Sequence, residues 1–178
     1  GQDFRSSTAG IGGHPALIEF SYSNSRHRLG SGESFRSPVA DSYRDAPEST
    51  LRRINTAIAH GHPWREAVHE HFAAAAPWLH QIITSSSRDL FFRQHPPRRG
   101  SQVLDVGAGW GQISIPLARS CQVTALEPTP ERLDFVQLVA CQEALAEQMH
   151  FIQADLFEVD FASRFDLISV IGVLEWVP

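Results

Sequence analysis

The chain is poor in several residue types, and each scarcity narrows the classes of protein to which it can belong. It has no lysine, so all 15 basic side chains are arginine and no Gly-Lys-Ser/Thr phosphate-binding loop is present. Its two cysteines, Cys121 and Cys141, are too few for a disulfide framework and lack metal-binding spacing. No run of 18 apolar residues exists, and no charged-then-apolar signal pattern opens the chain. We therefore expect reduced thiols, no membrane span and a cytoplasmic location.

Charge is distributed unevenly along the 178 residues, whose formal net charge is −5. Residues 1–100 carry 12 arginines against 9 acidic residues, whereas residues 101–178 carry 3 arginines against 11. The overall charge gives no case for a nucleic-acid partner, and the acidic second part argues mildly against one. The length predicts one domain with an appendage.

The first part of the chain divides into two regions. Residues 1–48 are rich in Ser, Gly, Pro and Arg, which predicts a flexible or loosely packed N-terminal arm. Residues 49–100 predict a helical extension that ends in a linker, because apolar residues recur there at helical spacing. The first helix ends near Gly61, and a second helical stripe starts near Trp64 and is interrupted by Pro77.

Residues 101–178 alternate between short apolar runs and helical patterns. We expect strands at residues 103–106, 122–126, 150–153 and 165–171, a helix over 109–120, and a second helix that starts at Pro130 with Thr129 as its cap. Apolar runs of this kind suit strands that are covered on both faces. The order predicts an α/β fold with a parallel sheet.

Three glycines stand at alternate positions between the first strand and its helix: Gly107, Gly109 and Gly111. Glycines carry no Cβ, so a ligand can lie against bare backbone, and the start of a helix adds unpaired N–H donors. Ligands of doubly wound sheets bind at this point, beyond the carboxyl ends of the strands. Gln112 stands where a dinucleotide fingerprint has its third glycine, which counts against NAD or FAD.

Acidic residues follow the next two strands. Glu127 ends the second strand, where a carboxylate can accept hydrogen bonds from both hydroxyls of a ribose. Asp155 follows the third strand at the same sheet edge and could receive the exocyclic amine of a purine. These positions predict a ligand that contains a nucleoside.

Four segments in order now carry a family resemblance: "VLDVGAGWGQISIPLA", Glu127 after the second strand, "QADLF" and "FDLISVIGVLEWV". Together they cover residues 102–177, and they resemble the motifs of class I S-adenosylmethionine-dependent methyltransferases. The resemblance implies a Rossmann-like fold, S-adenosylmethionine as cofactor with S-adenosylhomocysteine as product, and methyl transfer as the reaction (EC 2.1.1.-).

The resemblance also implies roles for individual residues, while it identifies no catalytic base and no metal site. Asp105 orients the glycine loop or meets the methionine amino group through water, and Glu127 holds the ribose hydroxyls. Contacts to the cofactor are further expected from Gly107, Ala108, Gly109, Gly111, Pro128, Asp155, Leu156, Ile171 and Gly172. Glu175 and Trp176 are expected near the substrate entrance.

The methyl acceptor is not specified by any of these residues. The acidic second part favours a small-molecule or saccharide-like acceptor over nucleic acid. Two alternatives stay open: a methyltransferase-like module that binds without catalysis, and an NAD-dependent Rossmann oxidoreductase.

The family's sheet has seven strands in the order 3-2-1-4-5-7-6, and this sequence stops after the fourth. We therefore expect only the 3-2-1-4 half, with the C-terminal strands missing, weak cofactor binding and poor catalysis. The fourth strand would be an apolar edge, which calls for cover by the N-terminal helices, a partner or a second copy.

Overall fold

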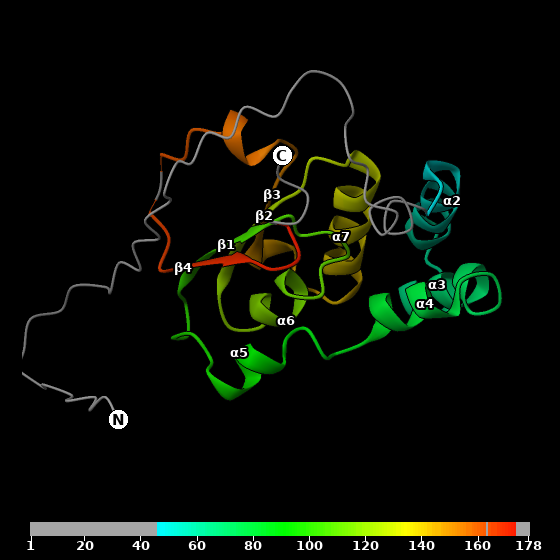
Figure 1. The fold of residues 1–178 in the computed structure, drawn as a ribbon, viewed down its shortest axis with the longest axis horizontal. Helices are drawn as coiled ribbons and strands as arrows, with labels where there is room; N and C mark the ends of the chain where they lie inside the picture. Colours follow the sequence, from blue (N-terminus) through cyan, green and yellow to red (C-terminus); the bar gives the residue numbers. More distant parts are fainter. Residues whose placement is uncertain (1–45, 163, 174–178) are drawn as a thin grey trace, which may run out of the picture. The chain divides into compact units, whose positions relative to one another are not determined.

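The computed structural model describes residues 46–162 and 164–173, and Figure 1 shows how their elements are arranged. Four parallel strands form one sheet in the order β3-β2-β1-β4. The strands are β1 (Gln102–Val106), β2 (Gln122–Leu126), β3 (Met149–Ile152) and β4 (Leu167–Val170). The predicted α/β, Rossmann-like sheet with its 3-2-1-4 order is thus confirmed.

Helices precede the sheet and connect its strands. The extension ahead of β1 holds α2 (Glu48–Ala59), α3 (Trp64–Phe72), α4 (Pro77–Thr84) and α5 (Leu90–Gln94). The connections within the sheet hold α6 (Ser114–Ala118), α7 (Pro130–Gln142) and the short 3-10 helices η1 (Ala146–Gln148) and η2 (Leu156–Glu158). The N-terminal helical segment is confirmed, and the interruption at Pro77 separates two helices because proline suits the first position of α4.

The two faces of the sheet have different covers. Side chains alternate along a strand, so Val103, Val123 and Ala125 share one face and pack with the helices into the main core. Leu104, Val106 and Leu126 share the other face. There the cover comes from the segment between β3 and β4, including Phe161 and Phe165.

Helix α2 packs alongside α7 (Figure 1). Leu51, Ile54 and Ile58 are buried at helical spacing, which gives α2 an apolar stripe. Arg52 Nη2 lies 2.8 Å from Glu131 Oε1, and this hydrogen-bonded guanidinium lowers the pKa of the Glu131 carboxyl. The helical extension is therefore packed into the core of the α/β sheet.

One local expectation for the connections was wrong, and another is confirmed only in position, because Thr129 is the N-cap residue of α7 and Pro130 begins that helix. The helix predicted over residues 109–120 is only Ser114–Ala118, because Gly109 and Gly111 adopt left-handed backbone angles that a helix cannot include. The Thr129 side chain makes no capping hydrogen bond at the start of α7. Instead the Thr129 amide donates to the Glu127 carboxylate, over 3.0 Å.

One edge strand of the sheet is β4, which pairs with β1. Ile168 on this strand is 58% exposed to solvent in the described structure. Cover of that edge by a partner stays a prediction, as does the division at residues 48 and 100. Residues 1–45 of the predicted arm lie outside the described residues. In the part of the chain that is described, no helix has the length and apolar character needed to cross a membrane.

Candidate cofactor site

The glycine loop folds back over the end of β2. Gly107, Gly109 and Gly111 have φ angles of 67°, 57° and 74°, in the left-handed region that favours glycine. The amides of Gly107 and Ala108 both donate to the Leu126 carbonyl oxygen, over 2.8 and 3.0 Å. The backbone path between β1 and α6 therefore favours glycine at all three positions, before any ligand is considered.

The space around the three glycines differs. A Cβ on Gly107 would lie 2.4 Å from Val173 Cγ2, and a Cβ on Gly111 would lie 3.0 Å from Ile115 Cγ1. At Gly109 the nearest atom to such a Cβ is the Gly107 carbonyl oxygen, 3.7 Å away. Gly107 and Gly111 thus make room for the protein's own side chains, while Gly109 borders open space.

Glu127 joins the glycine loop to the end of β2. Its side chain is buried, with the residue only 3% exposed. Glu127 Oε2 accepts a hydrogen bond from the Gly109 amide over 2.9 Å, and Oε1 accepts one from the Thr129 amide. The structure thus brings together the acid and the loop that the sequence places 18 residues apart.

Asp105 lies beneath the loop and away from solvent, with 3% of the residue exposed. Its carboxylate accepts a hydrogen bond from the Ser114 hydroxyl at the start of α6, and Ser169 stands beside it in the β1–β4 register. Burial raises the pKa of Asp105 to about 6, and the bond from Ser114 opposes that rise. Asp105 is therefore joined to the start of α6, the element that directly follows the glycine loop.

The segment after β3 reaches the same edge. The Glu127 amide donates to the Ile152 carbonyl oxygen over 3.1 Å, which places the end of β3 beside the end of β2. Asp155 is exposed, and its Oδ1 accepts a hydrogen bond from the Phe157 amide, so it caps η2. Pro128 and Leu156 are also exposed, and the predicted adenine-side residues therefore lie at the surface.

The end of β4 forms the other side of the site. A residue that sequence reasoning missed, Arg88, lies beside it. Ile171 and Gly172 directly follow β4, and both are exposed. Arg88, from the segment between α4 and α5, places Nη1 3.2 Å from where a Cβ on Gly172 would be. Arg88 had no local signal, since its position depends on a contact with a residue 84 positions later. Glu175 and Trp176 lie outside the described residues.

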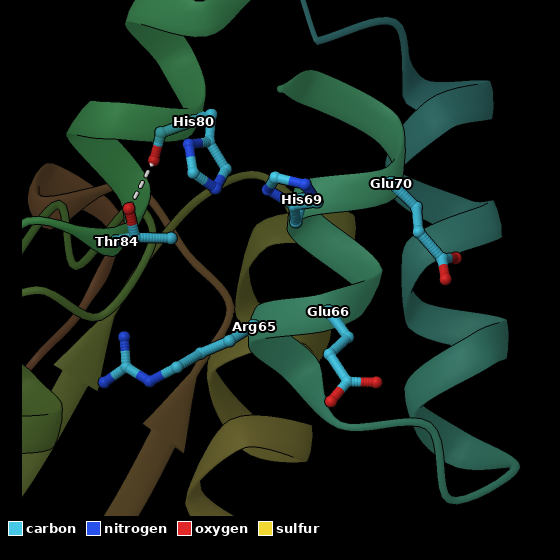
Figure 2. A pocket seen from close by; sticks show the side chains of 6 residues that line it. All are labelled: Arg65, Glu66, His69, Glu70, His80 and Thr84. Atoms are coloured by element: carbon cyan, nitrogen blue, oxygen red, sulfur yellow. Dashed lines mark hydrogen bonds between the residues drawn. The ribbon is translucent and has the colours of Figure 1, made fainter. Parts of the chain in front are cut away.

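A hollow of about 410 Å³ opens between α3 and α4, away from the glycine loop (Figure 2). The residues that line it are Arg65, Glu66, His69, Glu70, His80 and Thr84. The rings of His69 and His80 meet edge to face with centroids 5.1 Å apart, while Glu70 points away from them and bonds His62. The wall carries both charges, so it favours no single class of ligand. Within residues 46–162 and 164–173, no group of three acidic, His or Cys side chains could hold a metal ion.

The edge formed by the glycine loop, Glu127, Asp155 and Gly172 has the chemistry of a nucleoside site. The backbone is open at Gly109. Carboxylate acceptors follow two neighbouring strands, β2 and β3, and the Arg88 guanidinium lies beside the end of β4. Carboxylate oxygens accept hydrogen bonds from ribose hydroxyls, and a guanidinium binds carboxylates in a fork-like geometry. Such an edge can therefore hold a ligand that has a nucleoside at one end and an anionic group at the other.

Comparisons with known proteins find methyltransferases among the proteins that this chain is similar to. A family model described as "Methyltransferase domain" matches residues 103–178. A ubiquinone biosynthesis O-methyltransferase of Xanthomonas axonopodis pv. citri is 31% identical over 80 residues, 44% of this chain and 34% of that protein. An uncharacterised protein of Mycobacterium tuberculosis is 41% identical over 80 residues, 43% of this chain and 28% of that protein. The chain thus spans about a third of the length of these relatives.

Among solved structures, the glycopeptide N-methyltransferase MtfA in complex with sinefungin is similar with a TM-score of 0.41 and 22% identity. The likeness covers 47% of this chain and 34% of that one. The matched family, the four ordered motifs and the strand order agree with one another. Residues 103–178 therefore match a methyltransferase domain, and their motifs and strand order are similar to those of the class I, Rossmann-like S-adenosylmethionine-dependent methyltransferases.

Proposed function

We propose that this chain binds S-adenosylmethionine at the carboxyl edge of the sheet and transfers its methyl group to an acceptor. The observation that carries the proposal is the 2.9 Å hydrogen bond from the Gly109 amide to the Glu127 carboxylate. It joins the glycine loop after β1 to the acid after β2, so that one ligand can touch both. Asp155 and Gly172 extend the same edge to β3 and β4.

The residues at this edge fit the parts of that cofactor. Glu127 can accept hydrogen bonds from the ribose hydroxyls, and Asp155 can accept one from the adenine amine. The exposed Pro128 and Leu156 offer apolar surface to the adenine ring. When bound, the cofactor supplies a methyl group already activated by its sulfonium. The chain then needs to align the acceptor with that methyl group and to exclude water.

Arg88 adds a cation at the methionine end of the proposed site. Its guanidinium lies beside Gly172, and Val173 packs against the position of a Gly107 Cβ. The end of β4, the start of the glycine loop and Arg88 are therefore close together. A methionine carboxylate at this place would gain charge-assisted hydrogen bonds from Arg88.

We expect Arg88→Met to weaken S-adenosylhomocysteine binding by roughly 1.5–3 kcal/mol, the usual worth of hydrogen bonds to a charged group. Isothermal titration calorimetry measures this loss. Methylthioadenosine lacks the methionine carboxylate, so its affinity should be the same for both proteins. Arg53→Met, at an exposed position of α2, is the matched control. An equal loss for both ligands would contradict the carboxylate contact.

We expect Glu127→Ala to weaken S-adenosylhomocysteine binding by roughly 1–3 kcal/mol, because polar partners are left unpaired. The Gly109 and Thr129 amides lose their acceptor as well, so part of this loss reflects the loop. A 2′-deoxyribose analogue separates the hydroxyl contact from the effect on the loop. If Glu127 binds the 2′-hydroxyl, Glu127→Ala should weaken binding of this analogue less than it weakens binding of S-adenosylhomocysteine. Unchanged affinity for S-adenosylhomocysteine would remove Glu127 from the site.

The acceptor we favour is a small molecule or a saccharide-like compound. Residues 101–178 carry 11 acidic residues against 3 arginines, a balance that disfavours a polyanionic nucleic acid. A panel of phenolic, amine and sugar acceptors, assayed with radiolabelled S-adenosylmethionine, tests this choice. Transfer to RNA alone would contradict it. Cofactor binding without transfer to any acceptor would favour a non-catalytic binding module.

A further inference from the structure

Gln112 connects the glycine loop to the helical extension. It directly follows Gly111, and its Nε2 donates a hydrogen bond of 2.6 Å to the carbonyl oxygen of Ile82 in α4. Both residues are partly buried, which shields the bond from water. The two partners stand 30 positions apart in the sequence.

The Ile82 carbonyl oxygen is free to accept this bond because it lies in the last turn of α4, which ends at Thr84. The final helical bond of α4 runs from the Ser85 amide to the Gln81 carbonyl oxygen, so the next carbonyl, that of Ile82, lies among the last four of the helix. Such carbonyls have no partner within their helix. Gln112 supplies the missing donor and thereby fixes the end of α4 against the loop.

A second contact joins the loop to the same extension. The Trp110 ring meets the rings of Phe72 in α3 and Phe135 in α7 edge to face, with centroids 6.1 and 5.2 Å away. Six residues after Ile82, Arg88 lies beside Gly172. The glycine loop therefore contacts the end of α3 through Phe72 and the last turn of α4 through Ile82. The segment that carries Arg88 follows directly after α4.

We infer that Gln112 is a positioning residue that couples α4 to the glycine loop, so that cofactor affinity depends on the helical extension. This inference rests on the proposed function, because the affinity in question is that for S-adenosylmethionine and its product. Coupling of this kind is reciprocal. Binding at the loop must then order the end of α4, and a loosened α4 must weaken binding.

Three variants test the coupling, with S-adenosylhomocysteine as the probe and calorimetry as the measurement. Gln112→Met keeps the size and removes the donor, and we expect a dissociation constant about two- to tenfold higher at every pH. Gln112→Glu places an ionised carboxylate against the Ile82 carbonyl oxygen at pH 8, and we expect at least a tenfold loss there. Gln137→Glu, at an exposed position of α7, is the control and should bind as the natural chain does.

The Gln112→Glu protein should regain affinity as the pH falls to 5, because a protonated carboxyl can again donate to Ile82. The other titratable groups are the same in both proteins, among them Asp105 and Glu127 beside the loop and His80 on α4, so the ratio to the natural chain at each pH isolates residue 112. In hydrogen exchange, the ligand should protect residues 77–92 in the natural chain and less so in Gln112→Met.

The outcomes separate the inference from the proposed function. If the natural chain does not bind S-adenosylhomocysteine, the proposed function fails. If the natural chain binds it and both Gln112 variants bind equally well at pH 8, the coupling is contradicted. A pH-independent loss in Gln112→Glu would also contradict it.

Discussion

Asp105→Asn should raise the free energy of unfolding at pH 7 by up to about 3 kcal/mol. Burial raises the pKa of Asp105 to about 6, against an ordinary value of 3.8. At about 1.36 kcal/mol for each pKa unit, the difference makes the ionised side chain cost about 3 kcal/mol in the folded state. Asparagine has nearly the same shape and can still accept the Ser114 hydrogen bond.

The destabilisation by Asp105 depends on pH, because only the ionised carboxylate is costly to bury. Between pH 4 and 6 the folded chain binds more protons at Asp105 than the unfolded chain does, so this residue lowers stability as the pH rises. Below pH 4 both states are protonated and the cost is absent. Urea unfolding at pH 4, 5, 6 and 7 should show the natural chain losing stability relative to Asp105→Asn. Parallel curves for the two proteins would contradict the buried charge, and Asp134→Asn at an exposed position is the control.

A buried carboxylate that destabilises the fold calls for a functional reason. If Asp105 meets the methionine amino group through water, Asp105→Asn should be more stable and should bind S-adenosylhomocysteine less tightly. If Asp105 only orients the loop through Ser114, affinity should change little. Calorimetry on the same preparations decides between these two roles.

Gly107→Ala should lower the free energy of unfolding by about 2–5 kcal/mol and raise the cofactor dissociation constant at least tenfold. The left-handed φ of 67° costs a residue with a Cβ about 1–2 kcal/mol. The new Cβ would lie 2.4 Å from Val173 Cγ2, and overpacking of this kind costs about 1–3 kcal/mol more. Val173 must shift, and the end of β4 moves with it.

Two further variants separate these causes. Gly100→Ala measures the cost of the left-handed angle alone, because its φ is 81° and no atom lies within 4 Å of the new Cβ. Adding Val173→Ala to Gly107→Ala removes the clashing methyl groups and should recover most of the overpacking cost. If the double variant is no more stable than the additive expectation from the two single variants, the packing explanation is wrong.

Much of the fold could be predicted from the sequence where the information is local. The bounds of the second strand were predicted correctly, and those of the first to within one residue, because apolar runs set them. The Glu127–glycine loop contact follows from the rule that parallel strands end at one edge. The shortened α6 was missed because glycine spacing does not reveal which residues adopt left-handed angles.

Two features of the site depend on contacts between distant residues, and sequence reasoning missed them for that reason. Arg88 reaches Gly172 only after α4 and α5 have packed. In the sequence, Gln112 was considered only because it replaces the third glycine of a dinucleotide-binding motif. In the structure, its side-chain amide donates a hydrogen bond to the Ile82 carbonyl oxygen. Burial of Asp105 did have a signal, since it stands between Leu104 and Val106 in a strand covered on both faces.

The central claim is that the edge formed by the glycine loop and Glu127 holds S-adenosylmethionine. Calorimetric titration of the chain with S-adenosylhomocysteine and, separately, with NADH tests it most directly. We predict saturable one-to-one binding of S-adenosylhomocysteine and no binding of NADH. Tight binding of NADH, with no response to S-adenosylhomocysteine, would contradict the claim and favour the oxidoreductase alternative.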